Sequence, residues 1–222
     1  DIAHPEDRLQ LVKLAKAAHL IYEDQIYLES AGKMYPDIQE KKTFPGGVEV
    51  RFRPIKPSDE EEMRRLFYRF SDRAVYYRYF TPVKTMPHNR MQEYVNVDFD
   101  TTMSIVGVVG PPGEGRIVAE ARYARSRNSL WADLAFLVDE AYQGLGIASY
   151  MFQLLLRVAK DRCIQGFTAD VLVSNKPMLR VFEKAAERVD VKMDHGVYLV
   201  SIPFEENPAC GLMESQTEQQ ET

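Results

Sequence analysis

The chain has 222 residues, 45% hydrophobic and 27% charged, which is typical of a globular domain large enough to bury a full core. Its net charge of −5 equals the charge of the glutamates in residues 205–222, so the rest of the chain is neutral and gives no support to binding of nucleic acid or an anionic membrane. Two cysteines are too few for a disulfide framework or a zinc site, which suits a reducing cytoplasm, and no apolar run is long enough for a membrane helix.

Three parts are expected along the chain. Residues 1–43 are predicted to form an N-terminal helical appendage with a polar linker, and its helix is expected over 5–20. The run Phe44-Pro45-Gly46-Gly47 marks a boundary, so the main domain is predicted to span 44–204. Residues 205–222 form an acidic tail that is expected to be disordered. Because the chain begins with Asp1, we expect it to be a piece of a longer protein.

Within the main domain, hydrophobic periodicity predicts seven strands and four helices. The expected order is a strand at 48–53, helices from about 58 and at 87–97, strands at 103–109, 116–125 and 130–138, a helix at 147–163, a strand at 167–173, a helix at 177–186 and a hairpin near 189–204. This order predicts an α/β (α+β) fold. The segment 71–97 is the hardest to interpret, and we expect it to contain the cleft for the acceptor substrate.

The most informative segment leads from a strand into a long helix. Phe136, Leu137 and Val138 end the strand, and the helix begins after a loop with two glycines, in the run Gln143, Gly144, Leu145, Gly146, Ile147, Ala148 and Ser149. A helix start offers unpaired N–H groups and the positive end of the helix dipole, and glycine lets a large anion approach. The segment therefore predicts a pyrophosphate site.

Other phosphate-binding patterns do not fit this loop. Ser149 stands where a dinucleotide fingerprint needs its third glycine, and no Gly-Lys-Ser/Thr follows. An ordinary strand-to-helix turn remains an alternative.

The glycine-rich run Gly110–Gly115 joins two predicted strands, so it is expected to be a hairpin turn. His4, His19, His88 and His195 have no ligand spacing, so no metal is expected.

The spacing Gln143-x-x-Gly146-x-Ala148 resembles the Q/R-x-x-G-x-G/A signature of the GNAT superfamily of acyl-CoA-dependent N-acyltransferases. The element order is similar, with the phosphate loop after the fourth strand of a mixed sheet. The run Val173–Leu179 resembles the segment that contacts the pantetheine and pyrophosphate of CoA, which implies contacts from Asn175 and Met178. From its chemistry alone, Asn175 could equally be a helix N-cap. The resemblance covers about residues 48–204 and implies acetyl-CoA as co-substrate.

A narrower resemblance concerns the predicted strand at 130–138. The run Trp131–Val138 looks like a strand of the bacterial protein-lysine acetyltransferases, in which a glutamate is thought to be the general base. Asp133 occupies that position, which implies it as the base, acting through a water because its side chain is shorter. Glu120 is the second candidate. Asp133 could instead end in solvent or pair with an arginine. The backbone N–H groups of Leu137 and Val138 would polarise the thioester carbonyl.

One position departs from the family pattern. Many GNAT enzymes have a tyrosine seven residues after the asparagine, which protonates the leaving thiolate, and here that position is Phe182. Phe182 is expected to contact the cofactor without supplying a proton. A thiolate with a pKa of about 8.5 can leave unassisted.

The N-terminal run Ile2–Ala18 resembles the end of acetyl-CoA hydrolase/CoA-transferase proteins. This resemblance implies a cytoplasmic bacterial fusion with a CoA-transferase-like domain upstream.

Two functions remain open. The first is an N-acetyltransferase acting on an amine, above all a protein lysine. The second is a non-catalytic module that senses acetyl-CoA and regulates the attached CoA-transferase domain.

Overall fold

The computed structural model describes residues 5–28 and 36–205. The chain divides into two compact units, Asp1–Val118 and Ala119–Thr222. Residues 206–222, which include almost all of the predicted acidic tail, lie outside the described residues.

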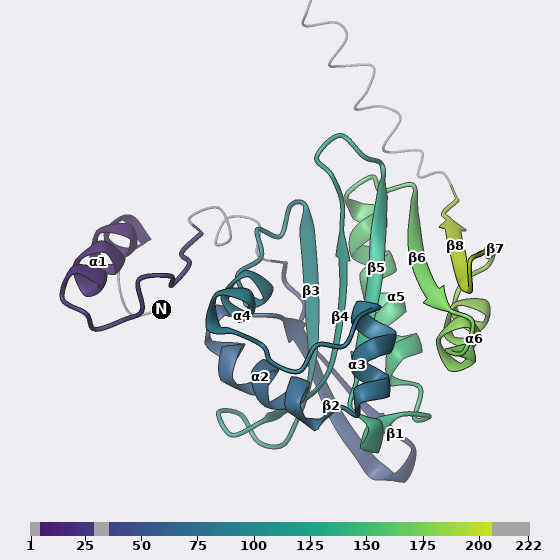
Figure 1. Ribbon diagram of the computed structural model, residues 1–222, viewed down its shortest axis with the longest axis horizontal. Helices are drawn as coiled ribbons and strands as arrows, with labels where there is room; N and C mark the ends of the chain where they lie inside the picture. Colours follow the sequence, from purple (N-terminus) through teal and green to yellow (C-terminus); the bar gives the residue numbers. More distant parts are fainter. Residues whose placement is uncertain (1–4, 29–35, 206–222) are drawn as a thin grey trace, which may run out of the picture. The chain divides into compact units, whose positions relative to one another are not determined.

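The first unit contains an N-terminal helix, three complete strands and three further helices (Figure 1). These are α1 (Pro5–Ala17), β1 (Glu40–Phe44), β2 (Val48–Pro54), α2 (Glu60–Arg69), α3 (Asp72–Tyr79), α4 (His88–Val95) and β3 (Thr102–Val109). The boundary between the units falls within β4 (Arg116–Ala124). The second unit continues with β5 (Trp131–Val138), α5 (Ile147–Asp161), β6 (Gly166–Leu172), α6 (Lys176–Ala185), β7 (Asp190–Asp194) and β8 (Val197–Pro203).

The strands form one mixed sheet in the order β1-β2-β3-β4-β5-β6-β8-β7. Strands β5 and β6 are parallel, and the pairs β1–β2, β2–β3, β4–β5, β6–β8 and β7–β8 are antiparallel. The predicted α/β class and mixed sheet are thereby confirmed. The described residues contain eight strands and six α-helices, and strand β1 and helix α3 were not predicted from the sequence.

Strand β1 was missed because its own sequence is polar. Only Phe44 of its five residues is buried, and Lys41 and Lys42 are exposed. The strand exists because it pairs with β2, from Glu40 opposite Phe52 to Phe44 opposite Val48. The predicted boundary between residues 43 and 44 therefore falls inside a strand.

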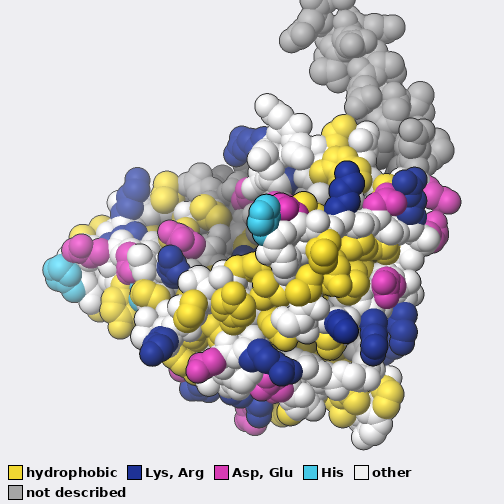
Figure 2. Space-filling model, turned by 45° about the vertical axis from the view of Figure 1, so that its right-hand side comes forward, with side chains coloured by type: hydrophobic (Ala, Val, Ile, Leu, Met, Phe, Trp, Pro, Cys, Tyr) yellow, Lys and Arg dark blue, Asp and Glu magenta, His cyan; other side chains and the backbone are white. Residues whose placement is uncertain are grey.

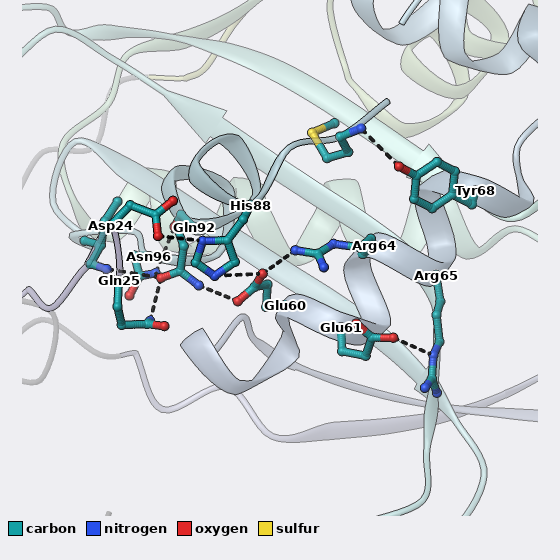
Figure 3. A network of polar contacts seen from close by, with 12 residues as sticks. Asp24, Gln25, Glu60, Glu61, Arg64, Arg65, Tyr68, His88, Gln92 and Asn96 are labelled. Atoms are coloured by element: carbon teal, nitrogen blue, oxygen red, sulfur yellow. Dashed lines mark hydrogen bonds and ion pairs between the residues drawn. The ribbon is translucent and has the colours of Figure 1, made fainter. Parts of the chain in front are cut away.

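A buried glutamine ties the N-terminal segment to the helices of the first unit (Figure 3). Gln92 of α4 is fully buried, and its side-chain oxygen accepts hydrogen bonds from Gln25 Nε2 at 2.5 Å and from the Ile26 N–H at 3.1 Å. Asn96 Nδ2 donates to the same oxygen at 3.1 Å. The Gln92 amide nitrogen donates to the Glu60 carboxylate on α2. Residues 25 and 26 therefore pack as part of the first unit.

His88 lies beside this glutamine and faces two carboxylates. Its Nδ1 is 2.9 Å from the Asp24 carboxylate and its Nε2 is 3.4 Å from that of Glu60, while the Tyr22 ring lies 4.4 Å from the imidazole centroid. The hydrogen bond from His88 lowers the pKa of Asp24 below its ordinary value of 3.8. The imidazole thus links the N-terminal segment to α2.

Five aromatic side chains form the core of the second unit. Phe152 of α5 lies 6.0 Å from Phe167 of β6 and 6.2 Å from Phe182 of α6, measured between ring centroids. Phe182 also lies 6.0 Å from Phe136 of β5, and Tyr123 of β4 lies 5.7 Å from Phe167. These contacts place α5 and α6 on one face of this part of the sheet.

The surface carries charges of both signs. Figure 2 shows Lys and Arg side chains interspersed with Asp and Glu around an area of hydrophobic side chains. Among the described residues, no helix combines the length and the apolar character needed to cross a bilayer.

Cys163 lies just after α5 and has φ 56°. Cys210 lies outside the described residues.

Candidate functional site

The predicted phosphate loop joins β5 to α5, and its first turn is shaped by a buried carboxylate. Asp139 is 6% exposed, and its side chain accepts a hydrogen bond from the Ala141 N–H at 3.1 Å. Its carbonyl accepts from the Tyr142 N–H at 2.8 Å, which closes a 3₁₀ turn at Glu140–Tyr142. This turn fixes the direction in which the chain leaves the strand.

Two glycines then bring the chain to the start of α5. Gly144 has φ 77° and Gly146 has φ 91°, a region that favours glycine, and a Cβ at either position would meet no atom within 4 Å. The first hydrogen bond of the helix runs from the Tyr150 N–H to the Gly146 carbonyl. Within the described residues, no acceptor bonds the N–H groups of Ile147, Ala148 and Ser149. The loop therefore combines open space with three unsatisfied donors.

The side chains of the loop are arranged around this opening. Gln143 is exposed, and its Nε2 donates to the Val138 carbonyl at 3.0 Å, which ties the loop back to the end of β5. Leu145 is half-buried and Ile147 is buried in the core. Ile147 can therefore offer a ligand its N–H group, while its side chain anchors the helix.

Strands β5 and β6 pair over only three residues and then diverge (Figure 1). Their register runs from Trp131 opposite Gly166 to Asp133 opposite Thr168. Strand β5 continues to Val138, where it still pairs with Ala119 of β4 on its other side. Within the part of the chain that the structure describes, its backbone groups facing β6 after Asp133 thus have no strand partner. Successive N–H groups point to opposite edges of a strand, so only one of those of Leu137 and Val138 faces this open edge.

Asp133 lies at the point where the two strands separate. Its side chain is exposed and accepts a hydrogen bond from the Thr168 hydroxyl, its register partner on β6. It points to the face opposite the aromatic core, because it alternates with Leu134 and Phe136. Asp133 thus reaches solvent while bonding Thr168, and no arginine pairs with it among the described residues. The Thr168 hydroxyl fixes one side of the carboxylate.

Glu120 lies on the same face but in a different environment. It is fully buried, and its carboxylate is 2.6 Å from Nε of Arg122, whose side chain is 13% exposed. Its register partner is Leu137, four residues along β5 from Asp133, which corresponds to about 13 Å. A base must reach the proton that it removes, so burial and ion pairing make Glu120 the weaker candidate.

Asn175 and Met178 lie where β6 leads into α6. Asn175 is at the N-cap position, but its side chain makes no capping bond, and its carbonyl accepts from the Met178 N–H at 3.1 Å. Both side chains are partly exposed. Asn175 therefore occupies the N-cap position, as one of the two alternatives had it, but its carboxamide does not cap the helix.

Two of the residues predicted to contact the cofactor, Phe136 and Phe182, have side chains that are buried in the aromatic core. Phe182 is 1% exposed and Phe136 is 7% exposed, and their rings pack against each other. Phe182 offers almost no surface to a ligand in this structure. Substitution of tyrosine by phenylalanine at this position therefore places an apolar ring in an apolar environment, with no hydroxyl to satisfy.

Sequence reasoning missed two residues of this region, Thr168 and Asp139. Thr168 could not be found because its role depends on the register between β5 and β6. Asp139 could have been found from the sequence. It follows a predicted strand, and an aspartate side chain at such a place commonly accepts a hydrogen bond from the backbone two residues further on, which begins a turn. Among the described residues, no group of three or more potential ligands is arranged to hold a metal ion.

The second unit thus brings together a helix start with N–H groups that have no acceptor among the described residues, a parallel strand pair that separates after Asp133, and an exposed carboxylate at the point of separation. Residues 61–186, more than half of the chain, match the model of the acetyltransferase (GNAT) family, whose members use acetyl-CoA. The chain belongs to this family, which makes it a GNAT-type acyltransferase domain.

Several relatives refine this assignment. Acetyltransferase Pat of Mycolicibacterium smegmatis is 30% identical over 151 residues, which cover 68% of this chain and 44% of that protein. Acetyltransferase PA5475 of Pseudomonas aeruginosa is 27% identical over 119 residues, covering 54% of this chain and 64% of that protein. The crystal structure of the GNAT domain of S. lividans PAT has a TM-score of 0.70 and 27% identity, covering 77% of this chain and 99% of that domain. The chain spans about half the length of the curated relatives that it matches.

Proposed function

We propose that this chain transfers an acetyl group directly from acetyl-CoA to an amine, and that the amine is a protein lysine. The observation that carries the proposal is the divergence of β5 and β6 after Asp133. It lies on the strand that leads to a helix start where three N–H groups have no acceptor among the described residues. The preference for a protein lysine rests on the resemblance of residues 131–138 to the bacterial protein-lysine acetyltransferases.

The proposed binding of acetyl-CoA uses backbone donors above all. The N–H groups of Ile147, Ala148 and Ser149 would bind the pyrophosphate, helped by the helix dipole. The open edge of β5 would pair with the amides of the pantetheine arm as a further strand does, and Asn175 would bind the same arm from β6. Acetyl-CoA supplies the acetyl group as an activated thioester.

Asp133 would remove the proton from the attacking amine. A lysine amine has a pKa of about 10.4, so presenting it neutral at pH 7 costs about 4.6 kcal/mol without a base. The Asp133 carboxylate has one side held by Thr168, and its short side chain suits a relay through one water. No tyrosine is at position 182, so the thiolate would leave unassisted, which its pKa of about 8.5 permits.

The direct test is a thiol-release assay with acetyl-CoA and candidate lysine peptides, proteins and small amines. Asp133→Ala should lower kcat by about 100-fold or more, the usual contribution of a general base, and leave the Kd of acetyl-CoA unchanged. Asp133→Glu, which places the family's usual residue at this position, should retain activity. Asp161→Ala, at the end of α5, removes an exposed carboxylate as a matched control. Activity of Asp133→Ala equal to the parent would eliminate Asp133 as the base.

The second candidate is an acetyl-CoA-sensing module of a cytoplasmic CoA-transferase or hydrolase. The observation that favours it is the buried Phe182, which cannot donate a proton. The resemblance of residues 2–18 to the end of such proteins supports a covalently linked partner domain. Acetyl-CoA binding without turnover on any acceptor would support this candidate and overturn the enzymatic one.

A further inference from the structure

Strand β7 forms one end of the sheet, and its hairpin holds it in a defined position. It pairs with β8 along its whole length, from Asp190 opposite Ser201 to Asp194 opposite Val197. The two turn residues, His195 and Gly196, have φ 44° and 85°, and positive values at both positions are typical of the tight turns that match strand twist. The outer edge of β7 pairs with no other strand in the described part of the chain.

This edge exposes apolar side chains. All five residues of β7 are exposed, with Val191 at 40% and Met193 at 72%. Val191 shares its face with the buried Val200, its register partner, and Met193 shares the same face with Tyr198. An exposed edge strand with apolar side chains is a template for pairing with another strand.

The charges on the edge select one pairing. Arg188, Asp190, Lys192 and Asp194 alternate in sign along the strand and just before it. If two such strands pair antiparallel about a two-fold axis at Val191, Asp190 lies opposite Lys192 of the second copy, and Arg188 lies opposite Asp194. An axis at Lys192 would instead place Lys192 opposite itself and Asp190 opposite Asp194. Only the first of these registers joins opposite charges.

We propose that β7 pairs antiparallel with β7 of a second copy of this chain, about a two-fold axis through Val191. The pairing joins the two sheets edge to edge and places Val191 beside its counterpart and Met193 opposite Val189. Because the same strand serves both copies, the contact is closed and gives a dimer rather than a fibre.

Two ion pairs within the chain already involve charged residues of this edge. Asp194 lies 2.5 Å from Nδ1 of His195, but the two side chains are 62% and 95% exposed, so this contact is weak. Arg188 pairs with Asp190 of its own chain at 3.0 Å, but the two side chains are 71% and 51% exposed, so this ion pair is weak. The interface is short, which predicts a transient dimer with a Kd in the micromolar range. None of these residues belongs to the proposed acetyl-CoA site, so the two proposals fail independently.

The test uses sedimentation velocity across a concentration series, with charge reversals at the edge. Asp190→Lys alone places two lysines opposite each other, and Lys192→Asp alone places two aspartates opposite each other, so each should weaken dimerisation by at least about tenfold. An equimolar mixture of these two variants should form a heterodimer, because every pair is then of opposite charge. The double variant D190K/K192D should dimerise alone.

Glu183→Lys and Lys184→Asp, exposed on α6, carry the same changes in net charge and should dimerise as the parent does. Circular dichroism establishes that each variant is folded. A parent chain that stays monomeric at every concentration overturns the proposal. A dimer that survives both single reversals also overturns it, because the contact then lies elsewhere.

Discussion

The start of α5 and the surroundings of Gln92 differ in whether their polar groups have hydrogen-bond partners within the protein. At the start of α5, three N–H groups have no acceptor among the described residues, in an exposed loop with two glycines. Around Gln92, both polar atoms of a fully buried carboxamide are bonded to side chains or backbone of the same unit. Donors left open at a solvent-facing loop indicate a place for a ligand, whereas buried groups bonded to each other indicate a part of the fold.

The largest expected effect is on acetyl-CoA binding, and it comes from a substitution in the loop before α5. Gly146→Ala introduces a Cβ at φ 91°, which forces the backbone to move and displaces the three N–H groups from a bound pyrophosphate. Charge-assisted hydrogen bonds contribute about 1.5–3 kcal/mol each, so loss of one to two should weaken acetyl-CoA binding by about 100-fold. Isothermal titration calorimetry measures this change.

Gly113→Ala is the matched control. Gly113 has φ 89° and equally open surroundings, but it lies in the connection between β3 and β4. The variant should show a similar backbone strain of about 1–2 kcal/mol and normal acetyl-CoA binding. If both variants bind acetyl-CoA equally well, the pyrophosphate does not bind at the start of α5.

Loss of the hydrogen bonds around Gln92 should lower the stability of the protein. Gln92→Leu keeps the volume but removes the partner of Gln25, Ile26 and Glu60, so the free energy of unfolding should fall by about 2 kcal/mol. Urea denaturation measures the loss, and hydrogen exchange should accelerate at the Ile26 N–H. Gln153→Leu removes one exposed bond to the Ala185 carbonyl and should change stability by under about 0.5 kcal/mol. Equal losses of stability in the two variants would show that the buried hydrogen bonds of Gln92 contribute no more than an exposed one.

Thr168→Val tests the hydrogen bond from Thr168 to Asp133, which is exposed but has a partner within the protein. The variant removes the hydroxyl that holds the exposed Asp133 carboxylate, and one hydrogen bond of about 1 kcal/mol corresponds to about a fivefold lower kcat. The Kd of acetyl-CoA should stay constant. Thr168→Ser retains the hydroxyl and should retain the rate. An unchanged rate in Thr168→Val would show that Asp133 needs no such support.

The smallest effect is the pH dependence of the contact between Asp24 and His88. The pKa of Asp24 is lowered in the folded state, so its contribution to stability is present above the ordinary value of 3.8 and is lost as the pH falls through the folded value. Asp24→Asn should therefore flatten the stability profile below about pH 4, the ordinary range of this carboxyl group. Denaturation midpoints from pH 2 to pH 6, compared with those of Asp161→Asn, measure the difference.

The sequence by itself determined the features that depend on local pattern. The glycines at 144 and 146 and the apolar periodicity of 147–159 are local, and the structure places a helix start and a buried helix face there. The α/β class and the family followed from element order and from Gln143, Gly146 and Ala148. Strand β1 could not be predicted, because a strand with one buried residue of five is specified by its partner β2.

Only the tertiary structure decided how residues from distant segments meet. The pairing of Asp133 with Thr168, the burial of Glu120 against Arg122 and the position of Phe182 in the aromatic core all depend on strand register and helix packing. The closure of Gln92 by residues 25 and 26 joins segments more than sixty residues apart. Side-chain periodicity specifies which face of an element is buried, but the identity of the neighbour across that face is set by the packing of the whole chain.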